Sequence, residues 1–191
     1  MISSWCAYGG AVALHYLLNY QEEVSGAVLL APVSYMDEPP DGSPFSFPSI
    51  PGLGSVLTNT VLLPVGERIA PKMYEQAFYP EEAPEEYVDT MTALYLRPAN
   101  FTATAGELSV MQESVQAISS DYEKIKVPVN IVFGTSDQMV DLEKDGQRLA
   151  ENLPNGELIE VEGAGHKLHH SYSDLVLEVI NDVIQESNLW E

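Results

Sequence analysis

The sequence predicts an α/β fold built on a parallel sheet. Two observations carry this prediction: short, continuously apolar runs typical of buried parallel strands, and helical segments that alternate with them along the chain. The apolar runs cover residues 24–32 and 127–133, and a third strand is expected over residues 157–161. Helices are expected over residues 11–20, 142–153 and 174–185, each with apolar side chains at helical spacing.

Composition and charge limit the partners of the chain. Its 191 residues are 45% hydrophobic and 19% charged, which is ordinary for a globular protein. The 29 acidic residues outnumber the 8 basic ones and give a net charge of −21. Nucleic acids and anionic membrane surfaces would repel such a chain, so neither is expected as a partner. The sequence does not fix the oligomeric state.

The sequence contains no apolar run long enough to cross a bilayer, so no membrane span is expected. Cys6 is the only cysteine, which excludes an intrachain disulfide and a cysteine-based zinc site. No Lys or Arg precedes the first apolar residues, and a signal peptide is therefore not expected. The compartment stays open, with the cytoplasm as the default.

Residues 4–14 have the pattern of a tight strand-to-helix turn. In a G-x-S-x-G nucleophile elbow the serine stands two residues before the second glycine. Counting back from Gly9 places Ala7 at the serine position and Trp5 at the first glycine position. The following residues, from Tyr8 through Gly9 and Gly10, keep the small and apolar pattern of the helix that such a turn opens.

A segment between the first two apolar runs has a different composition. Prolines and glycines recur from residue 36 to residue 66, which predicts no regular element there, yet apolar residues are frequent. We expect residues 36–103 to form an inserted lid with a helix over 85–94 and a link at 96–98. Thr104 and Glu107 match a capping box that would open a helix reaching 118. The apolar side chains of the lid either pack on one another or face a substrate.

Two polar side chains follow the ends of predicted strands. Asp137 comes after Gly134, and His166 comes after Gly163 and Gly165. The carboxyl ends of parallel strands meet at one edge of a sheet, so a carboxylate and an imidazole could meet there as the acid and base of acyl transfer. Taken alone, Asp137 could equally be a turn or helix-cap aspartate.

His166, His169 and His170 could suggest a metal site, but no second set of ligands is visible in the sequence. We therefore expect neither a metal nor another cofactor. His169 and His170 are expected at the start of the last helix.

These motifs together resemble the C-terminal two-thirds of an α/β-hydrolase of the esterase, lipase and haloperoxidase-like superfamily. The resemblance implies a hydrolase core over residues 1–35 and 104–191, with the lid of residues 36–103 inserted between its parts. It also implies a catalytic triad with the nucleophile at Ala7, the acid at Asp137 and the base at His166. The backbone N–H of Tyr8 would line an oxyanion hole. The implied substrates are small hydrophobic esters or related acyl compounds.

The chain departs from the family at the position that matters most, because Ala7 has no hydroxyl with which to attack a substrate. Cys6, Ser3 and Ser4 stand nearby, but a shift along so sharp a turn would point their side chains elsewhere. We therefore expect the chain to be inactive on simple esters. The alternative is a pseudo-hydrolase that binds a hydrophobic ligand or a partner protein.

The resemblance also implies an incomplete fold, in which only the last strands of the sheet are present. With three strands, the edge beside residues 24–32 would be unpaired. A truncated gene product, an engineered variant and a natural pseudoenzyme remain alternative explanations of the sequence.

Overall fold

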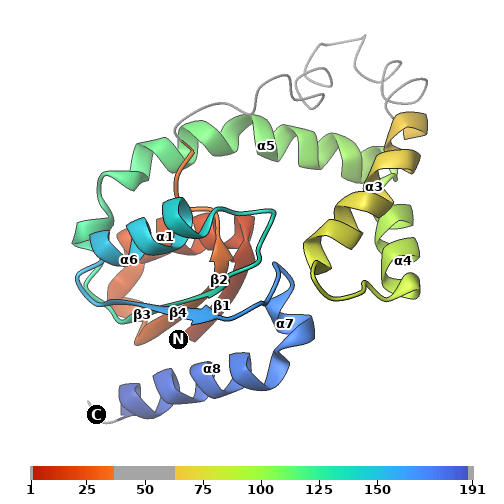
Figure 1. Ribbon diagram of the computed structural model, residues 1–191. Coiled ribbons are helices and arrows are strands. Elements are labelled where there is room, and N and C mark those ends of the chain that lie inside the picture. Colours follow the sequence, from red (N-terminus) through yellow and green to blue (C-terminus); the bar gives the residue numbers. More distant parts are fainter. Residues whose placement is uncertain (1, 37–62, 189–191) are drawn as a thin grey trace.

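Four strands form a single parallel sheet. The computed structural model describes residues 2–36 and 63–188, with the backbone alone for residues 2–7, 63, 101, 102, 105, 108, 109, 187 and 188. The strands are β1 (Ile2–Ala7), β2 (Gly26–Pro32), β3 (Val129–Gly134) and β4 (Gly156–Val161). They lie in the order β1-β2-β3-β4, and each adjacent pair is parallel (Figure 1). The predicted parallel sheet is confirmed.

The expectation of three strands and an unpaired edge was wrong. The backbone of β1 pairs with β2 from Ile2, opposite Gly26, to Cys6, opposite Leu30, and so covers the edge that we expected to be open. The sequence did not predict this strand because it is short and Ser3 and Ser4 interrupt its apolar residues.

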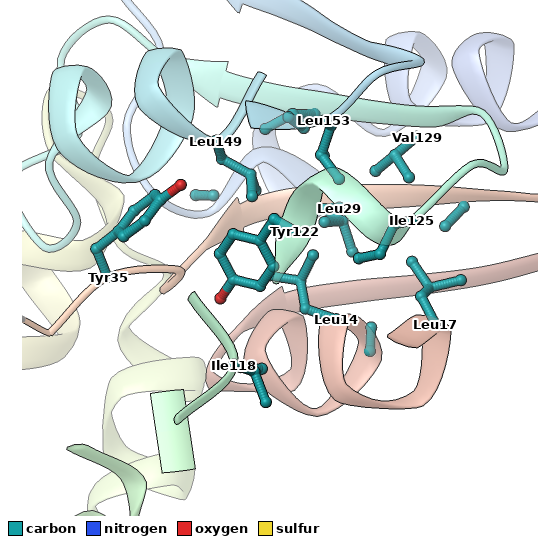
Figure 2. Packing of buried hydrophobic residues seen from close by; sticks show 14 of the residues in the cluster. Leu14, Leu17, Leu29, Tyr35, Ile118, Tyr122, Ile125, Val129, Leu149 and Leu153 are labelled. Atoms are coloured by element: carbon teal, nitrogen blue, oxygen red, sulfur yellow. The ribbon is translucent and has the colours of Figure 1, made fainter. Parts of the chain in front are cut away.

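One face of the sheet is covered by α1 (Tyr8–Tyr20) and α6 (Arg148–Asn152). Leu14 and Leu17 of α1 and Leu149 of α6 pack against Leu29 of β2 and Ile131 of β3 (Figure 2). All five side chains are buried, and this cluster forms the larger part of the core.

The opposite face is covered by α7 (Leu168–Ser171) and α8 (Ser173–Asn188). Val28 and Leu30, which alternate with Leu29 along β2, contact the apolar stripe of α8 formed by Val176, Val179 and Val183. Because successive residues of a strand point to opposite faces, a continuous apolar run is what a strand covered on both faces requires.

Three helices lie between β2 and β3 along the chain, and we call them the insertion helices. They are α3 (Leu63–Phe78), α4 (Glu85–Tyr95) and α5 (Pro98–Ser119). Figure 1 shows α3 and α4 as a separate group beside the sheet, with α5 reaching from them back across it. Residues 37–62, which we expected to belong to a lid, lie outside the described residues.

Two expectations for this part of the chain were wrong. Helix α3 begins at Leu63, inside the segment that we expected to hold no regular element. Helix α5 begins at Pro98, so Thr104 and Glu107 lie within it and do not form a capping box at its start. Proline is accepted at the first position of a helix because its missing N–H has no helical partner there.

Buried hydrogen bonds join the ends of the insertion to the core. The Tyr122 hydroxyl, in the short helix η4 (Tyr122–Lys124), donates to the Ser34 carbonyl at 2.8 Å. The rings of Tyr35 and Tyr122 meet edge to face at 5.6 Å between centroids. The point at which the chain leaves β2 is therefore joined to the point at which it returns.

A buried carboxylate completes this junction. Asp145 lies in η5 (Leu142–Gln147), a π-helical stretch that precedes α6, where we had expected a continuous α-helix over 142–153. Its Oδ1 accepts hydrogen bonds from the N–H groups of Ser34 at 2.7 Å and Tyr35 at 2.9 Å. The Ser34 hydroxyl donates to the Asp145 carbonyl at 2.9 Å. Burial raises the pKa of this carboxyl, although the N–H donors act in the opposite direction.

None of the helices within residues 2–36 and 63–188 has the length and apolar character needed to cross a membrane.

Candidate active site

The predicted strand-to-helix turn is present at residue 7. β1 ends at Ala7 and α1 begins at Tyr8, with no residue between them. The register slips here, because Cys6 pairs with Leu30 whereas Ala7 pairs with Pro32. The residue passed over is Ala31, which has a positive φ of 41° and forms a β-bulge.

Helix α1 starts unusually close to the end of β2. A Cβ atom added to Gly10 would overlap Cβ and Cα of Pro32, so this position of the helix requires glycine. Because the N–H groups in the first turn of a helix have no partner within it, the Tyr8 N–H is available at the turn as a donor.

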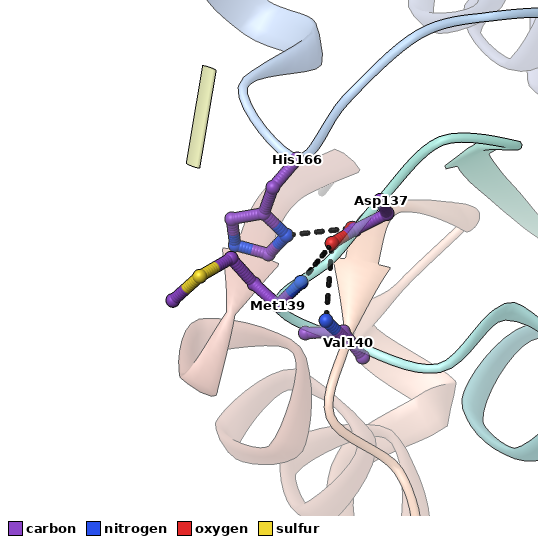
Figure 3. A network of polar contacts seen from close by, with 4 residues as sticks. All are labelled: Asp137, Met139, Val140 and His166. Atoms are coloured by element: carbon purple, nitrogen blue, oxygen red, sulfur yellow. Dashed lines mark hydrogen bonds and ion pairs between the residues drawn. The ribbon is translucent and has the colours of Figure 1, made fainter. Parts of the chain in front are cut away.

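The carboxylate of Asp137 is fixed by its own turn. β3 ends at Gly134, and Oδ1 of Asp137 then accepts hydrogen bonds from the N–H groups of Met139 at 2.7 Å and Val140 at 3.0 Å (Figure 3). Asp137 thus makes the bonds of a turn aspartate. Its second oxygen is left to act outside the turn.

The imidazole of His166 meets that second oxygen. His166 Nδ1 lies 2.7 Å from Asp137 Oδ2, and the two side chains are 7% and 0% exposed (Figure 3). An ionised carboxylate can only accept, so Nδ1 carries the proton and the lone pair of the neutral ring lies on Nε2. The structure therefore brings together two of the residues that the sequence singled out.

Backbone contacts between the two turns explain why these residues meet. The Thr135 N–H donates to the Val161 carbonyl at 3.1 Å, and the Ser136 N–H donates to the Ala164 carbonyl at 2.9 Å. The Gly163 N–H donates to the Thr135 hydroxyl at 2.8 Å. The turn after β3 and the turn after β4 are thereby joined into one unit.

Ala7 ends its strand at the same edge of the sheet, because β1 is parallel to β3 and β4. The side chain of Ala7 is outside the described atoms, as are those of Cys6, Ser3 and Ser4. Residues 7, 137 and 166 therefore lie at one edge of the sheet, and the side-chain contact described among them is that between Asp137 and His166.

The insertion helices contact the His166 turn directly, which the sequence did not indicate. A Cβ atom added to Gly165 would overlap the carbonyl oxygen of Tyr79, which directly follows α3. Glycine therefore allows the turn that carries His166 to approach the end of α3 at backbone distance.

Aromatic side chains extend this contact. The His170 ring lies 5.4 Å from the Phe78 ring of α3 and 5.0 Å from the Tyr87 ring of α4. It also lies 4.6 Å from the His169 ring. Burial lowers the pKa of His170, and His169 and Lys167 lower it further. We had expected His169 and His170 at the start of the last helix, but they belong to the separate short helix α7.

Tyr95, at the end of α4, is a further residue of this region that the sequence did not single out. Burial, together with smaller contributions from nearby Tyr74 and Tyr8, raises the pKa of its phenol to about 12. Tyr95 therefore keeps its proton at neutral pH and lies within electrostatic reach of the residue that opens α1.

Within the described part of the chain, no three His, Cys, Asp or Glu side chains are grouped so that they could hold a metal ion. The rings of His169 and His170 contact each other at a tilt of 50°, and the His170 ring contacts Phe78 and Tyr87 of the insertion helices.

Residues 6–171 match the family model of the alpha/beta hydrolase fold. The chain belongs to the α/β hydrolase fold family. A comparison with curated protein sequences finds no match.

Solved α/β hydrolases support the fold assignment. An α/β hydrolase fold protein from Burkholderia ambifaria has 23% identity and a TM-score of 0.72, over 95% of this chain and 65% of its own. An epoxide hydrolase has 17% identity and a TM-score of 0.70, over 97% and 68%. A thermophilic esterase from Thermogutta terrifontis has 14% identity and a TM-score of 0.69, over 98% and 65%. The chain thus spans about two thirds of the length of these hydrolases.

Proposed function

We propose that Asp137 and His166 form the acid and base of an acyl-transfer site in which Ala7 occupies the position of the nucleophile. The observation that carries this proposal is the buried 2.7 Å contact between His166 Nδ1 and Asp137 Oδ2. It lies at the edge of the sheet at which β1 ends and α1 begins. With a serine at position 7, His166 would accept the hydroxyl proton at Nε2 while Asp137 stabilises the resulting imidazolium.

The same chemistry predicts that the chain does not turn over esters with Ala7 in place. Without a hydroxyl there is no acyl-enzyme, whatever the quality of the acid and base. The Tyr8 N–H would supply one donor to the oxyanion, since it opens α1 directly after position 7.

We propose small hydrophobic esters or related acyl compounds as the substrates of this site, with residues 36–103 acting as a lid. The support is the set of aromatic side chains on the insertion helices: Phe78 and Tyr87 pack on His170 of α7, and Tyr95 lies near Tyr8. The net charge of −21 supports an uncharged or apolar ligand over a polyanion such as nucleic acid.

The test is the exchange Ala7→Ser, read out with a fluorophosphonate probe that reacts with activated serines. The unsubstituted chain should not be labelled, whereas Ala7→Ser should react at a measurable rate. Adding His166→Ala to Ala7→Ser should slow labelling on the order of 10³-fold, because the general base is lost. His169→Ala is the matched control, and it should leave the labelling rate within about twofold, since this ring contacts His170 and takes no part in the Asp137–His166 contact.

Hydrolysis of a chromogenic ester by the unsubstituted chain, abolished by His166→Ala, would overturn the proposal. If Ala7→Ser folds as the unsubstituted chain does but gives no labelling, the binding alternative is favoured. In that alternative the chain keeps the fold as a pseudo-hydrolase and binds a hydrophobic ligand or a partner protein. Its supporting observation is the apolar surface on α1 and α5 that is described next.

A further inference from the structure

A groove of about 640 Å³ runs between α1 and α5, away from the Asp137–His166 pair. Tyr8, Val12 and Tyr20 of α1 form one wall, and Glu107, Val110 and Met111 of α5 contribute to the other. Tyr8 and Tyr20 are the first and last residues of α1, so the groove follows the whole helix.

The side chains along this groove are unusually apolar for a surface. Val12 and Val110 are each 59% exposed, and Tyr8 and Tyr20 are 50% and 49% exposed. Single exposed apolar residues are normal on proteins, but several that gather around one groove mark a binding surface.

The charged side chains on the two helices that form the groove are acidic. Neither α1 nor α5 contains a lysine or arginine, whereas α5 carries Glu107 and Glu113. At the far end, the Tyr16 hydroxyl donates to Glu23 Oε2 at 2.9 Å and places a carboxylate beside the groove. The apolar floor is therefore bordered by acidic groups.

We propose that this groove binds a basic amphipathic helix of a partner protein. The apolar face of such a helix would cover Val12 and Val110, and its lysines or arginines would face the carboxylates of α5 and η1 (Gln21–Glu23). A second copy of this chain fits poorly, because two chains that each carry a charge of −21 repel one another.

The dimensions suit this occupant. α1 has 13 residues, and a helix of that length extends over roughly 20 Å. A partner helix of about four turns could lie along it and place apolar anchors at positions i, i+3, i+4 and i+7 on the groove.

The direct test is binding of a synthetic amphipathic helix of leucine and lysine, about 14 residues long, to the purified full chain. A peptide of the same composition but scrambled order controls for attraction to the net charge alone. Fluorescence anisotropy should show the amphipathic peptide binding at least about tenfold more tightly than the scrambled one, with affinity falling as salt increases.

Matched substitutions test the location. Val12→Glu and Val110→Glu should each weaken binding about tenfold, because they place a carboxylate in the apolar lining of the groove. Leu177→Glu is the control, since Leu177 is 56% exposed on α8, on the opposite side of the sheet, and should change the affinity less than about twofold.

A charge reversal gives a second test that leaves the floor intact. Glu107→Lys should weaken the basic peptide severalfold more than Glu178→Lys, an equivalent change on exposed α8. Equal binding of scrambled and amphipathic peptides would overturn the proposal, as would affinities that are unchanged by Val12→Glu and Val110→Glu. A dimer of the chain, detected by sedimentation and dissociated by the same two substitutions, would overturn it in favour of a second copy as occupant.

Discussion

Two buried carboxylates at the carboxyl-terminal edge of the sheet, Asp137 and Asp145, have different kinds of partner. Asp137 Oδ1 accepts hydrogen bonds from the neighbouring N–H groups of Met139 and Val140. Its Oδ2 contacts the ring of His166, which follows β4. Asp145 Oδ1 accepts from Ser34 and Tyr35, which are far away in the sequence, and links η5 to the end of β2. The first carboxylate is held by its own turn and orients His166. The second holds a distant segment, which indicates a structural role.

The pKa of Asp145 agrees with a structural role. Burial dominates at Asp145 and raises its pKa despite the backbone donors. Removing each carboxylate should therefore affect a different measured quantity.

The largest expected effect is on chemistry at Asp137. In the Ala7→Ser background, Asp137→Asn should slow fluorophosphonate labelling on the order of 10³-fold, because the amide can donate to Nδ1 and favours the wrong tautomer of His166. The Asn side chain can still accept from Met139 and Val140, so the free energy of unfolding in urea should change by less than about 1 kcal/mol. A large loss of stability with unchanged labelling would reverse the roles that we assign.

The next largest effect is on stability at Asp145. Asp145→Ala removes the acceptor of two buried N–H groups and should lower the free energy of unfolding by about 3 kcal/mol, measured by urea denaturation. Asp145→Asn keeps an oxygen acceptor without the buried charge and should cost less than about 1 kcal/mol. If both variants lose the same stability, the charge rather than the hydrogen bonds is what the junction requires.

A smaller effect is expected at the other side of this junction. Ser34→Ala keeps the backbone donor to Asp145 and loses the hydroxyl, which donates to the Asp145 carbonyl at 2.9 Å and lies 3.3 Å from Asp145 Oδ1. The free energy of unfolding should fall by about 1 kcal/mol in the same urea assay. Combining Ser34→Ala with Asp145→Ala should then cost less than the sum of the two changes, since they share partners. Strict additivity would argue against a shared network.

The smallest effect is the pH dependence of the Asp145 contribution. Its pKa in the native state is raised above the ordinary 3.8, so just above that value the native state binds more protons than the unfolded chain. The stability contributed by this group therefore falls as the pH rises through this interval. Urea titrations at several pH values should show that the free energy of unfolding of Asp145→Asn rises relative to that of the unsubstituted chain as the pH rises. A difference that is constant with pH would contradict burial as the cause of the raised pKa.

The strands and the Asp137–His166 pair were predictable because their signals are local. Apolar runs revealed β2 and β3, and short glycine-containing turns after β3 and β4 marked Asp137 and His166. Helix α3 was missed because Pro64 and Gly66 belong to the run of prolines and glycines that predicts no regular element, although a proline in the first turn costs no hydrogen bond.

Asp145 and the contacts of the insertion helices could not be read from the sequence, because their partners are distant. Asp145 bonds to Ser34 across 111 positions, and nothing near either residue marks the pairing. Likewise, the need for glycine at position 165 comes from the carbonyl oxygen of Tyr79, which is close in space but distant in the sequence.

The hydrogen bond between Tyr122 and Ser34 has an evolutionary consequence. This bond holds together Ser34, where the chain leaves β2, and Tyr122, where it returns towards β3. The segment between them is therefore a loop whose two ends are joined at the sheet. Exchange or lengthening of the parts of that segment that do not contact the His166 turn would leave the strand order undisturbed. The chain thus separates a part that can vary in sequence and size from a part whose geometry must stay fixed.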